Sequence, residues 1–564
     1  MDDFKELILN FLKKETNLEN IELEIPPNPE MGDYAFPCFV LAKEWKKSPN
    51  EIAEQLSKKY QSQPDFIVKN KKGESLIIEV NSIGPYVNFF TNKSILAEST
   101  IKQILKQKEK YGSSNIGKGK KILVEHTSIN PNASPHVGRA RNALIGDAIV
   151  RILRFQGYKV ETHYFVNDVG KQIAMLVLGS EGKKNVAFDD LLKIYIEINK
   201  KIEENPELEK KVLELLNLLE KGDKTIKNKF KKNVQVCVKG QVKILSELGI
   251  KYDFFDYESK YLWDKKTDET LKRLEKTGKL FIDGFNRWVM DQKGYSLGMK
   301  IPVLVMTRGD GTSLYPLRDI AYNIEKLKKG ENIVILGEDQ KLYQEQIAAV
   351  LKELELKLPR VVHYSFVLLQ EGKMSTRKGN VVLLEDFMNE AVEKASQELK
   401  RRYNKIDEKS AKAIAYGAVK YGILRVSPEK NVLFDLRQAL AFEGETSPYI
   451  QYAYARISSI LKKAKKINQK ADFGLLNKKE EQELIKLMSS FTDTITKATC
   501  DLRPHLIANY LYQLAQKFNE YYHIHQILKA DGKTRDARLL LISSVKQVIK
   551  NGLGLLGIEV LEKM

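Results

Sequence analysis

The sequence predicts an α/β fold joined to an all-α part: a doubly wound parallel sheet in the middle of the chain, an α+β unit before it and a helical bundle after it. From residue 121 onward, apolar runs of strand length alternate with amphipathic helical stretches, which is typical of a parallel sheet covered by helices. After about residue 400, proline becomes scarce and apolar residues recur at helical spacing. We therefore expect three units, at 1–112, 113–400 and 401–564.

The first unit is expected to open with a helix, because several apolar residues share one helical face. These residues are Leu7, Ile8 and Leu12. Two strands are expected at 76–80 and 87–90, beyond a region rich in proline and glycine. The stretch 111–120 is small, polar and basic, and we interpret it as a linker to the middle unit.

The middle unit carries the strands of the predicted parallel sheet. We place these strands at 122–124, 160–165, 302–306, 333–336 and 361–366. A charged insertion at about 180–252 interrupts the alternation, and its Lys- and Glu-rich pattern indicates a solvated helical hairpin to which we assign no chemistry. The last unit is expected to close with a helix that stops at 551–552, an Asn-Gly pair, because these residues favour helix ends.

The charge balance favours a polyanionic partner. Among 564 residues, 93 Lys and Arg stand against 74 Asp and Glu, which gives a formal net charge of +19. Such an excess attracts nucleic acid, although solubility alone would also account for it. The length corresponds to about four domain-sized units, so the chain can bury several cores.

The cysteines and the first residues argue against a disulfide-stabilised protein, a secreted protein and a membrane protein. Cys38, Cys237 and Cys500 are too few and too scattered for a disulfide framework or a Cys-x-x-Cys metal site. Residues 1–5 lack the basic and apolar pattern of a signal peptide, and no run of about 18 apolar residues occurs. We therefore expect a soluble cytoplasmic protein with reduced thiols, no membrane segment and no protein-bound metal.

A polar segment at 128–139 separates the strand at 122–124 from an amphipathic helix. Pro135 limits where that helix can begin. The turn between a strand and a helix is where α/β sheets hold nucleotide phosphates. His136 and Arg139 are three residues apart at the helix start, so both side chains lie on one face. Gly138 between them allows the backbone to approach a nucleotide closely.

A second basic segment lies at 371–380 and reads Glu-Gly-Lys-Met-Ser-Thr-Arg-Lys-Gly-Asn. Lys373 and Lys378 can supply mobile cations for the pyrophosphate side of a nucleotide. In this order, the two segments resemble the His-x-Gly-His and Lys-Met-Ser-Lys-Ser signatures of class I aminoacyl-tRNA synthetases. Further segments narrow the resemblance to the arginyl-tRNA synthetase family. They lie at 32–35, 128–131, 165–172, 310–319, 443–453 and 536–539.

The resemblance implies a Rossmann-type catalytic domain with a helical insertion, an N-terminal domain that contacts the tRNA D-loop and a helical anticodon-binding domain. The implied reaction joins L-arginine to ATP, which gives arginyl-adenylate and pyrophosphate, and then transfers arginine to the 3′ terminal adenosine of tRNA(Arg). Mg²⁺ is expected to accompany the ATP substrate. Family members depend on bound tRNA for adenylate formation and usually work as monomers, so both properties are expected here.

The resemblance also implies the site residues. Catalysis is expected from His136, Arg139, Lys373 and Lys378, and ATP binding from His136, Gly138, Arg139, Lys373, Met374 and Ser375. Arginine is expected to contact Ser128, Asn130, Glu258, Tyr315, Asp319 and Gln340. A guanidinium needs carboxylate partners, and Asp319 lies one helical turn after Tyr315. Contacts with tRNA are expected from Tyr86, Asn88, Tyr449, Gln451, Tyr452 and Arg456.

Two departures from the family pattern leave alternatives open. Arg139 stands at the second signature histidine, which replaces a neutral donor by a fixed cation. Thr376 stands at the fourth position of the second signature, so the transition state could be served by any of three cations. These cations are Lys373, Arg377 and Lys378. Ala133 stands where some family members carry a substituting lysine. A non-catalytic RNA-binding paralogue with the same fold is therefore the competing hypothesis.

Overall fold

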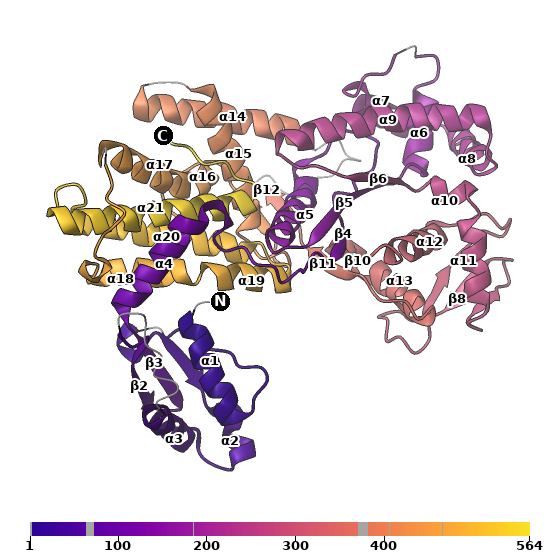
Figure 1. Ribbon diagram of the computed structural model, residues 1–564. Coiled ribbons are helices and arrows are strands. Elements are labelled where there is room, and N and C mark those ends of the chain that lie inside the picture. The colour runs from indigo at the N-terminus through magenta and orange to yellow at the C-terminus, as the bar shows by residue number, and fades with distance from the viewer. Residues whose placement is uncertain are drawn as a thin grey trace.

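The computed structural model describes residues 3–26, 28–63, 73–183, 185–369, 382–404, 407–464 and 466–564. Figure 1 shows three parts: a small N-terminal domain, a domain built on a parallel sheet, and a helical bundle beside that sheet. The N-terminal domain lies below the bundle in this view, and helix α4 runs upward from it. The expected fold class is confirmed by this arrangement.

The N-terminal domain packs helices against an antiparallel sheet with the strand order β1-β3-β2. Its elements are α1 (Asp3–Thr16), η1 (Pro29–Met31), β1 (Tyr34–Pro37), α2 (Phe39–Trp45), α3 (Pro49–Ser62), β2 (Ile77–Ile83) and β3 (Tyr86–Thr91). The apolar face of α1 is buried, as its spacing predicts. The two expected strands correspond to β2 and β3, which pair with each other.

The next segment belongs structurally to the bundle. Helix α4 (Lys93–Gln107) and the short η3 (Lys108–Lys110) pack on the C-terminal helices α18 (Lys479–Ser489) and α21 (Gly532–Leu555). Tyr111 stacks on Phe491 with 6.0 Å between ring centroids, and its hydroxyl donates to the Met488 carbonyl at 2.8 Å. The stretch interpreted as a linker is therefore anchored at its start by buried contacts.

The central sheet has five parallel strands in the order β11-β10-β4-β5-β6. They are β4 (Lys121–Glu125), β5 (Lys159–Val166), β6 (Phe254–Tyr257), β10 (Glu331–Gly337) and β11 (Arg360–Tyr364). The chain proceeds from β4 to β6 on one side and later adds β10 and β11 on the other. The switch point of the sheet therefore lies between β4 and β10, where α/β folds bind ligands.

One expected strand does not join this sheet. The run 302–306 forms β9 (Val303–Val305), which pairs with β8 (Trp288–Asp291) in a separate antiparallel sheet that also holds β7 (Leu280–Ile282). A short connection favours antiparallel pairing with a neighbour in sequence, whereas a parallel strand needs a long crossover. Strand β6, which the sequence interpretation missed, takes the fifth place in the parallel sheet.

Helices surround the parallel sheet. They are α5 (Val137–Phe155), α6 (Lys171–Gly179), α10 (Lys260–Trp263), α11 (Lys266–Glu275), α12 (Tyr315–Leu327), η4 (Glu338–Gln340) and α13 (Lys341–Glu353). The insertion contains three helices packed around α6, and not a simple hairpin. These are α7 (Asp190–Glu204), α8 (Glu207–Glu220) and α9 (Lys224–Glu247).

The helical bundle follows strand β12 (Val367–Leu369). This strand pairs in parallel with β13 (Val432–Phe434), which lies between α15 and α16 in the chain. Its other elements are α14 (Leu384–Tyr403), α15 (Glu408–Leu424), α16 (Leu436–Ala439), α17 (Ser447–Ala464), η6 (Phe473–Leu475), α19 (Phe491–Asp501) and α20 (His505–Ile524), besides α18 and α21. No helix in the described part of the chain is long and apolar enough to cross a membrane.

The closing helix runs past its expected end. Helix α21 continues through Asn551 and Gly552 to Leu555. A Cβ atom on Gly552 would lie 2.6 Å from Leu511, so this glycine permits close packing of α21 on α20. The Asn551 amide donates to the carbonyls of Lys108 and Tyr111 at 2.8 and 3.0 Å. Both residues serve helix packing here, and the chain turns only at Gly557, where φ is +67°.

We predict that Gly146→Ala destabilises the protein. Gly146 in α5 faces the buried ring of His126, and an added Cβ would lie 2.2 Å from its Cγ. Overpacking of this kind costs about 1–3 kcal/mol. Denaturant unfolding should show a lower midpoint. Gly554→Ala in α21 is the matched control, because no atom lies within 4 Å of its added Cβ; an equal loss in both variants would contradict the packing argument.

Candidate active site

The first signature segment lies at the switch point of the sheet, between β4 and α5. Thr127 and Ser128 both have positive φ, +84° and +39°, so the chain turns sharply after β4. The Thr127 amide donates to Asn142 Oδ1 at 2.6 Å, and Asn142 Nδ2 donates to the Ile335 carbonyl of β10 at 2.8 Å. The turn is thus held to both strands that border the switch point.

The insertion shapes the loop that carries the expected arginine contacts. Gln241 of α9 donates from Nε2 to the carbonyls of Asn130 and Ala133, at 3.0 and 2.8 Å. The buried Tyr164 hydroxyl donates to Gln241 Oε1 at 2.9 Å. The exposed Asn130 side chain donates to Gln172 Oε1 at 3.0 Å. Sequence reasoning missed Gln241, because only the folded chain brings α9 to this loop.

His136 is the N-cap residue of α5 and is neutral at physiological pH. Burial, together with the nearby Arg139 cation, lowers the pKa of His136 to about 4. Its Nδ1 atom is buried and has no hydrogen-bond partner among the described residues. Arg139 is exposed one turn later and forms no ion pair with the described part of the chain. The site therefore presents a neutral imidazole and an available guanidinium on adjacent turns.

The second signature lies outside the described residues, and this holds for Lys373, Met374, Ser375 and Lys378. The segment that follows it is described and pairs with the first signature. Val137 donates its amide to the Val382 carbonyl at 3.2 Å, and the Leu384 amide donates to the Pro135 carbonyl at 2.8 Å. The chain therefore returns from the second signature directly to the start of α5.

The expected carboxylates lie on α12 and on the segment after β6. Asp319 Oδ2 accepts a hydrogen bond from the Tyr343 hydroxyl at 2.9 Å, and Oδ1 accepts one from Asn323 Nδ2 at 3.1 Å. Tyr315, one turn earlier, is 55% exposed and lies against the Tyr343 ring with 5.1 Å between centroids. A carboxylate held by two hydrogen bonds thus lies beside an exposed aromatic ring.

Glu258 is already paired within the protein. Arg318 donates from Nε to Glu258 Oε1 at 2.7 Å, and both side chains are buried. The second oxygen of Glu258 has no hydrogen-bond partner among the described residues. Asp168 Oδ1 accepts from the Ser259 amide at 2.8 Å, so Asp168 braces the loop that carries Glu258.

The carboxyl groups of this pocket have raised pKa values. Burial raises the pKa of Asp319 to about 6, the Tyr343 hydrogen bond opposes this, and the nearby Glu125 charge adds to it. Burial also raises the pKa of Glu258 to about 7, although Arg318 opposes this shift. Glu125 itself ends β4 and forms a buried ion pair with Lys326 of α12. Such a crowded acidic pocket suits a cationic ligand.

The remaining expected contacts lie at the same edge of the sheet. Ser128 is half-buried in the turn after β4. Gln340 follows β10, is exposed, and donates to Asp339 Oδ2 at 2.9 Å. Among the described residues, no group of His, Cys, Asp or Glu is arranged to hold a metal ion.

Three family models match the chain in the order of its structural parts. Residues 100–436 match tRNA synthetases class I (R), catalytic domain. Residues 2–91 match the arginyl tRNA synthetase N terminal domain, and residues 450–564 match the DALR anticodon binding domain. The chain belongs to the arginyl-tRNA synthetase family.

Whole-length relatives agree with this assignment. The chain is 39% identical to arginine–tRNA ligase of Methanocaldococcus jannaschii, with 99% of each chain covered. It is 37% identical to the enzyme of the same name from Halothermothrix orenii, with 100% of each covered. Among solved structures, Thermus thermophilus arginyl-tRNA synthetase superimposes with a TM-score of 0.85 at 26% identity, and 99% of each chain is covered.

Two of the six expected tRNA contacts lie inside the protein. Asn88 of β3 is 2% exposed, and its amide donates to the Tyr86 carbonyl at 3.3 Å. Gln451 of α17 is fully buried and donates to the carbonyls of Ala413 and Glu559, at 3.3 and 2.8 Å. Both side chains hold neighbouring backbone in place in this structure, and direct contacts with tRNA stay a prediction for them.

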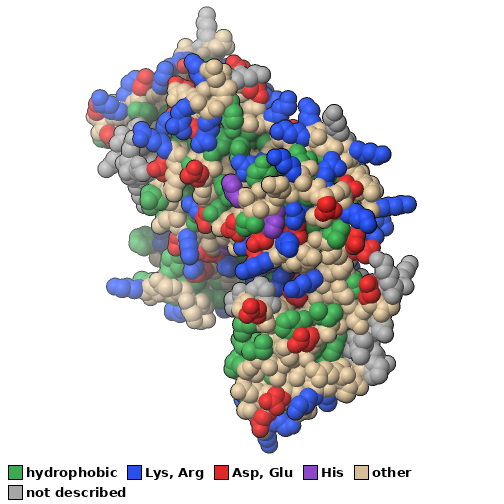
Figure 2. Space-filling view, turned by 90° about the vertical axis from the view of Figure 1, so that its left-hand side faces the viewer, with side chains coloured by type: hydrophobic (Ala, Val, Ile, Leu, Met, Phe, Trp, Pro, Cys, Tyr) green, Lys and Arg blue, Asp and Glu red, His purple; other side chains and the backbone are tan. Residues whose placement is uncertain are grey.

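The other expected tRNA contacts are partly exposed. Tyr86 packs edge-on against Phe39, which is 55% exposed. In α17, the Arg456 guanidinium lies over the rings of Tyr452 and Tyr522, at 4.6 and 4.9 Å. Tyr449 packs against Tyr512. Sequence reasoning missed three further members of the stack around Arg456: Arg402, Phe442 and Tyr522. Figure 2 shows Lys and Arg spread over the bundle's face.

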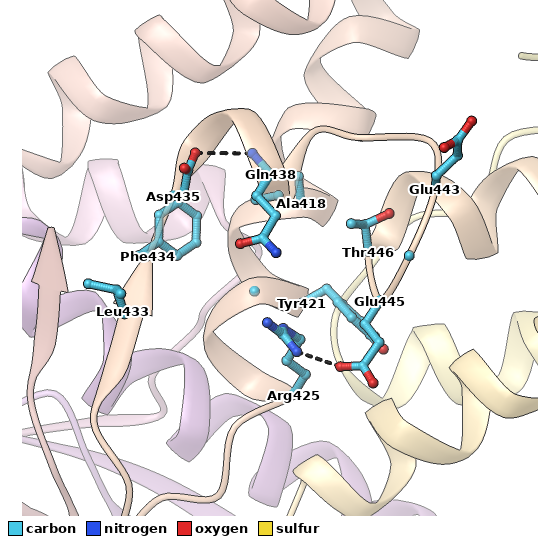
Figure 3. Close-up of a pocket in the computed structure, with 13 residues that line it drawn as sticks. Ala418, Tyr421, Arg425, Leu433, Phe434, Asp435, Gln438, Glu443, Glu445 and Thr446 are labelled. Atoms are coloured by element: carbon cyan, nitrogen blue, oxygen red, sulfur yellow. Dashed lines mark hydrogen bonds and ion pairs between the residues drawn. The ribbon is translucent and has the colours of Figure 1, made fainter. Parts of the chain in front are cut away.

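Residues 443–446, the start of one family segment, line a separate cavity of about 200 Å³ in the helical bundle. Figure 3 shows Arg425, the C-cap residue of α15, paired with Glu445 at 2.5 Å, and Asp435 accepting a hydrogen bond from the Gln438 amide. Residues 536–539, the family's Asp-Ala-Arg-Leu segment, also stabilise the bundle, because Arg538 forms a buried ion pair with Glu481 at 2.8 Å. Both family segments therefore contribute packing within the bundle.

We predict that arginine affinity falls at acidic pH. The Asp319 pKa of about 6 is raised above its ordinary value, so the carboxylate is ionised above pH 7 and becomes neutral as the pH falls through 6. A neutral acid cannot pair with guanidinium. Calorimetric titration should give a dissociation constant for arginine that rises as the pH falls from 8 to 5, most steeply below 6, because Glu258, with a pKa of about 7, loses its charge before Asp319 does. A flat profile down to pH 5, with the protein still folded, would exclude Asp319.

Proposed function

We propose that the protein is an arginine–tRNA ligase, which activates L-arginine with ATP and transfers the arginyl group from the adenylate to the 3′ terminal adenosine of tRNA(Arg). The observation that carries the proposal is the cluster of side chains around Asp319 beside the switch point of the sheet. It combines a supported carboxylate, the exposed ring of Tyr315 and a second buried carboxylate, that of Glu258. The family assignment supports the same reaction.

Arginine recognition is assigned to both ends of this pocket. Asp319 pairs with the substrate guanidinium, Tyr315 covers it, and the second oxygen of Glu258 accepts a further donor. Asn130, Ser128 and Gln340 hold the polar end of the amino acid. Because arginine carries a permanent cation, the negative charge of the pocket discriminates against neutral amino acids.

ATP is assigned to the turn between β4 and α5. His136 offers a neutral hydrogen-bonding imidazole, Gly138 allows close backbone approach, and Arg139 supplies positive charge for the phosphate oxygens. Lys373, Met374, Ser375 and Lys378 complete this end from the second signature. Mg²⁺ enters with ATP as part of the substrate and takes phosphate oxygens as ligands.

The tRNA partner is assigned to two surfaces. Tyr86 in the N-terminal domain and the aromatic and arginine stack of the bundle, with Tyr449, Tyr452 and Arg456, can stack on unpaired bases. The bundle's spread of basic side chains supplies attraction for the phosphate backbone. We infer that the protein acts as a cytoplasmic monomer, since one chain contains both the substrate pocket and the proposed tRNA surfaces.

Arginine-dependent pyrophosphate exchange tests the proposed function. The experiment is run with and without tRNA(Arg). Exchange that requires both arginine and tRNA would support the ligase and its expected tRNA dependence. Absence of exchange under both conditions, with tRNA still bound, would favour the non-catalytic RNA-binding paralogue.

We predict that Asp319→Asn abolishes most arginine activation while ATP binding is preserved. A buried guanidinium without its carboxylate costs about 3–5 kcal/mol, so kcat/KM for arginine should fall by at least about 100-fold. The amide has nearly the same shape as the carboxylate, and the ATP end of the cleft is untouched. Exchange kinetics at varied arginine, together with ATP titration, measure the two effects. Equal losses for both substrates would refute the assignment.

We predict that Arg139→Ala lowers the rate of arginine activation by about 10²–10³, the usual loss for one electrostatic donor. Arg139→His should recover part of the rate, because histidine restores the family's residue. Arg154→Ala is the matched control: this arginine is exposed on the last turn of the same helix and pairs with Asp253. Single-turnover measurements give the activation rates of all three variants. An unchanged rate in Arg139→Ala would assign phosphate stabilisation to other groups.

A further inference from the structure

Tyr343 contacts the expected arginine pocket from behind. It lies in the first turn of α13, and α13 packs on α12, which carries Asp319 and Tyr315. Its hydroxyl donates to Asp319 Oδ2 at 2.9 Å, and its ring lies at 49° to that of Tyr315. One side chain therefore supports both the carboxylate and the aromatic ring that face the substrate.

The Asp319 carboxylate is held at both oxygens. Tyr343 donates to Oδ2, and Asn323 of the same helix donates to Oδ1 at 3.1 Å. An ionised carboxylate has about four acceptor positions, so each oxygen keeps one position for an incoming donor. The two internal hydrogen bonds fix the plane of the group. A fixed plane suits the forked donors of a guanidinium, which pair best with a carboxylate held in one orientation.

The Tyr343 hydrogen bond also favours the charged form of Asp319. Burial penalises the charge, and the neighbouring Glu125 carboxylate adds to that penalty. A hydroxyl that donates to the carboxylate opposes both effects. If the hydroxyl were absent, a larger fraction of Asp319 would be protonated near neutral pH, and a protonated acid pairs poorly with a cation.

We propose that Tyr343 is a positioning residue for arginine recognition, which orients the Asp319 carboxylate through its hydroxyl and supports Tyr315 through its ring. This inference rests on the proposed function, because it assumes that Asp319 binds the substrate guanidinium. Tyr343 acts through Asp319 and does not itself touch the reacting atoms. Its effect is therefore on arginine affinity and not on the chemical step.

Tyr343→Phe tests the proposal, because it keeps the ring and removes only the hydroxyl. Loss of one hydrogen bond to a charged group corresponds to about a 10- to 150-fold higher KM for arginine. We expect kcat to stay within about twofold and KM for ATP to stay unchanged. The ratio of the variant's arginine KM to that of the wild type should grow as the pH is lowered from 8 to 6.5, because the Asp319 pKa rises in the variant. A residue with only a packing role would not give this pH dependence.

Tyr261→Phe is the matched control. Tyr261 is also a buried tyrosine, and its hydroxyl donates to a different carboxylate, Glu325 Oε2, at 3.2 Å. Its loss should leave the arginine KM and its pH profile as in the wild type. Tyr343→Phe combined with Asp319→Asn provides a double-mutant cycle. If Tyr343 acts through Asp319, its substitution should change arginine KM by less than twofold in the Asp319→Asn background.

The outcomes separate the two proposals. Absence of arginine-dependent exchange by the wild-type protein, with tRNA present, would refute the proposed function itself. Normal wild-type exchange with an unchanged arginine KM in Tyr343→Phe would refute only the positioning role. The same rise in KM in Tyr343→Phe and Tyr261→Phe would also overturn it, since loss of either buried hydroxyl would then have the same effect.

Discussion

The arrangement of the active site depends on the buried guanidinium of Arg141. This α5 side chain is inaccessible to solvent, and burial lowers its pKa to about 10, so it is still a cation at neutral pH. It donates to the carbonyls of Ser365, Phe366 and Ser427, at 2.7, 3.4 and 2.9 Å. A buried cation without acceptors would be very unfavourable, so these carbonyls must stay in place. The helix of the first signature, the strand leading to the second and the bundle are thereby held together.

Buried polar side chains that need hydrogen-bond partners also connect the bundle to the catalytic domain. Lys420 of α15 is buried and donates to the carbonyl of Gly557, while Gln451 of α17 joins α15 to the C-terminal segment. Helix α15 in turn packs on α5. The helix that presents Arg456 is therefore connected to the signature helix through packed helices and satisfied polar groups.

Local signals predicted much of the fold, and contacts between distant segments account for what was missed. Pro135 and the apolar spacing after it define α5, because both act within one helix. The strand at 302–306 was assigned to the wrong sheet, since its own residues do not specify a partner. For the site, Asp319 and Tyr315 could be proposed from spacing and family likeness. Gln241 could not be, because it meets the Asn130 loop only after folding. Burial of Asn88 was equally hidden, because polar residues look alike in sequence whether they contact solvent or backbone.

The pocket expected to bind arginine contains an arginine of its own, and this constrains how recognition works. Arg318 neutralises Glu258, while Asp168 and Asp319 add further negative charge nearby. Burial raises the pKa values of all three acids, and Arg318 opposes this shift at Glu258. A substrate cation supplies the missing positive charge, and a neutral amino acid does not. Lysine also carries a charge, but its ammonium lacks the planar fork of donors that pairs with both oxygens of a fixed carboxylate. Under the proposed function, the acidic groups of this site select a cation, and the fixed orientation of the Asp319 carboxylate selects a guanidinium.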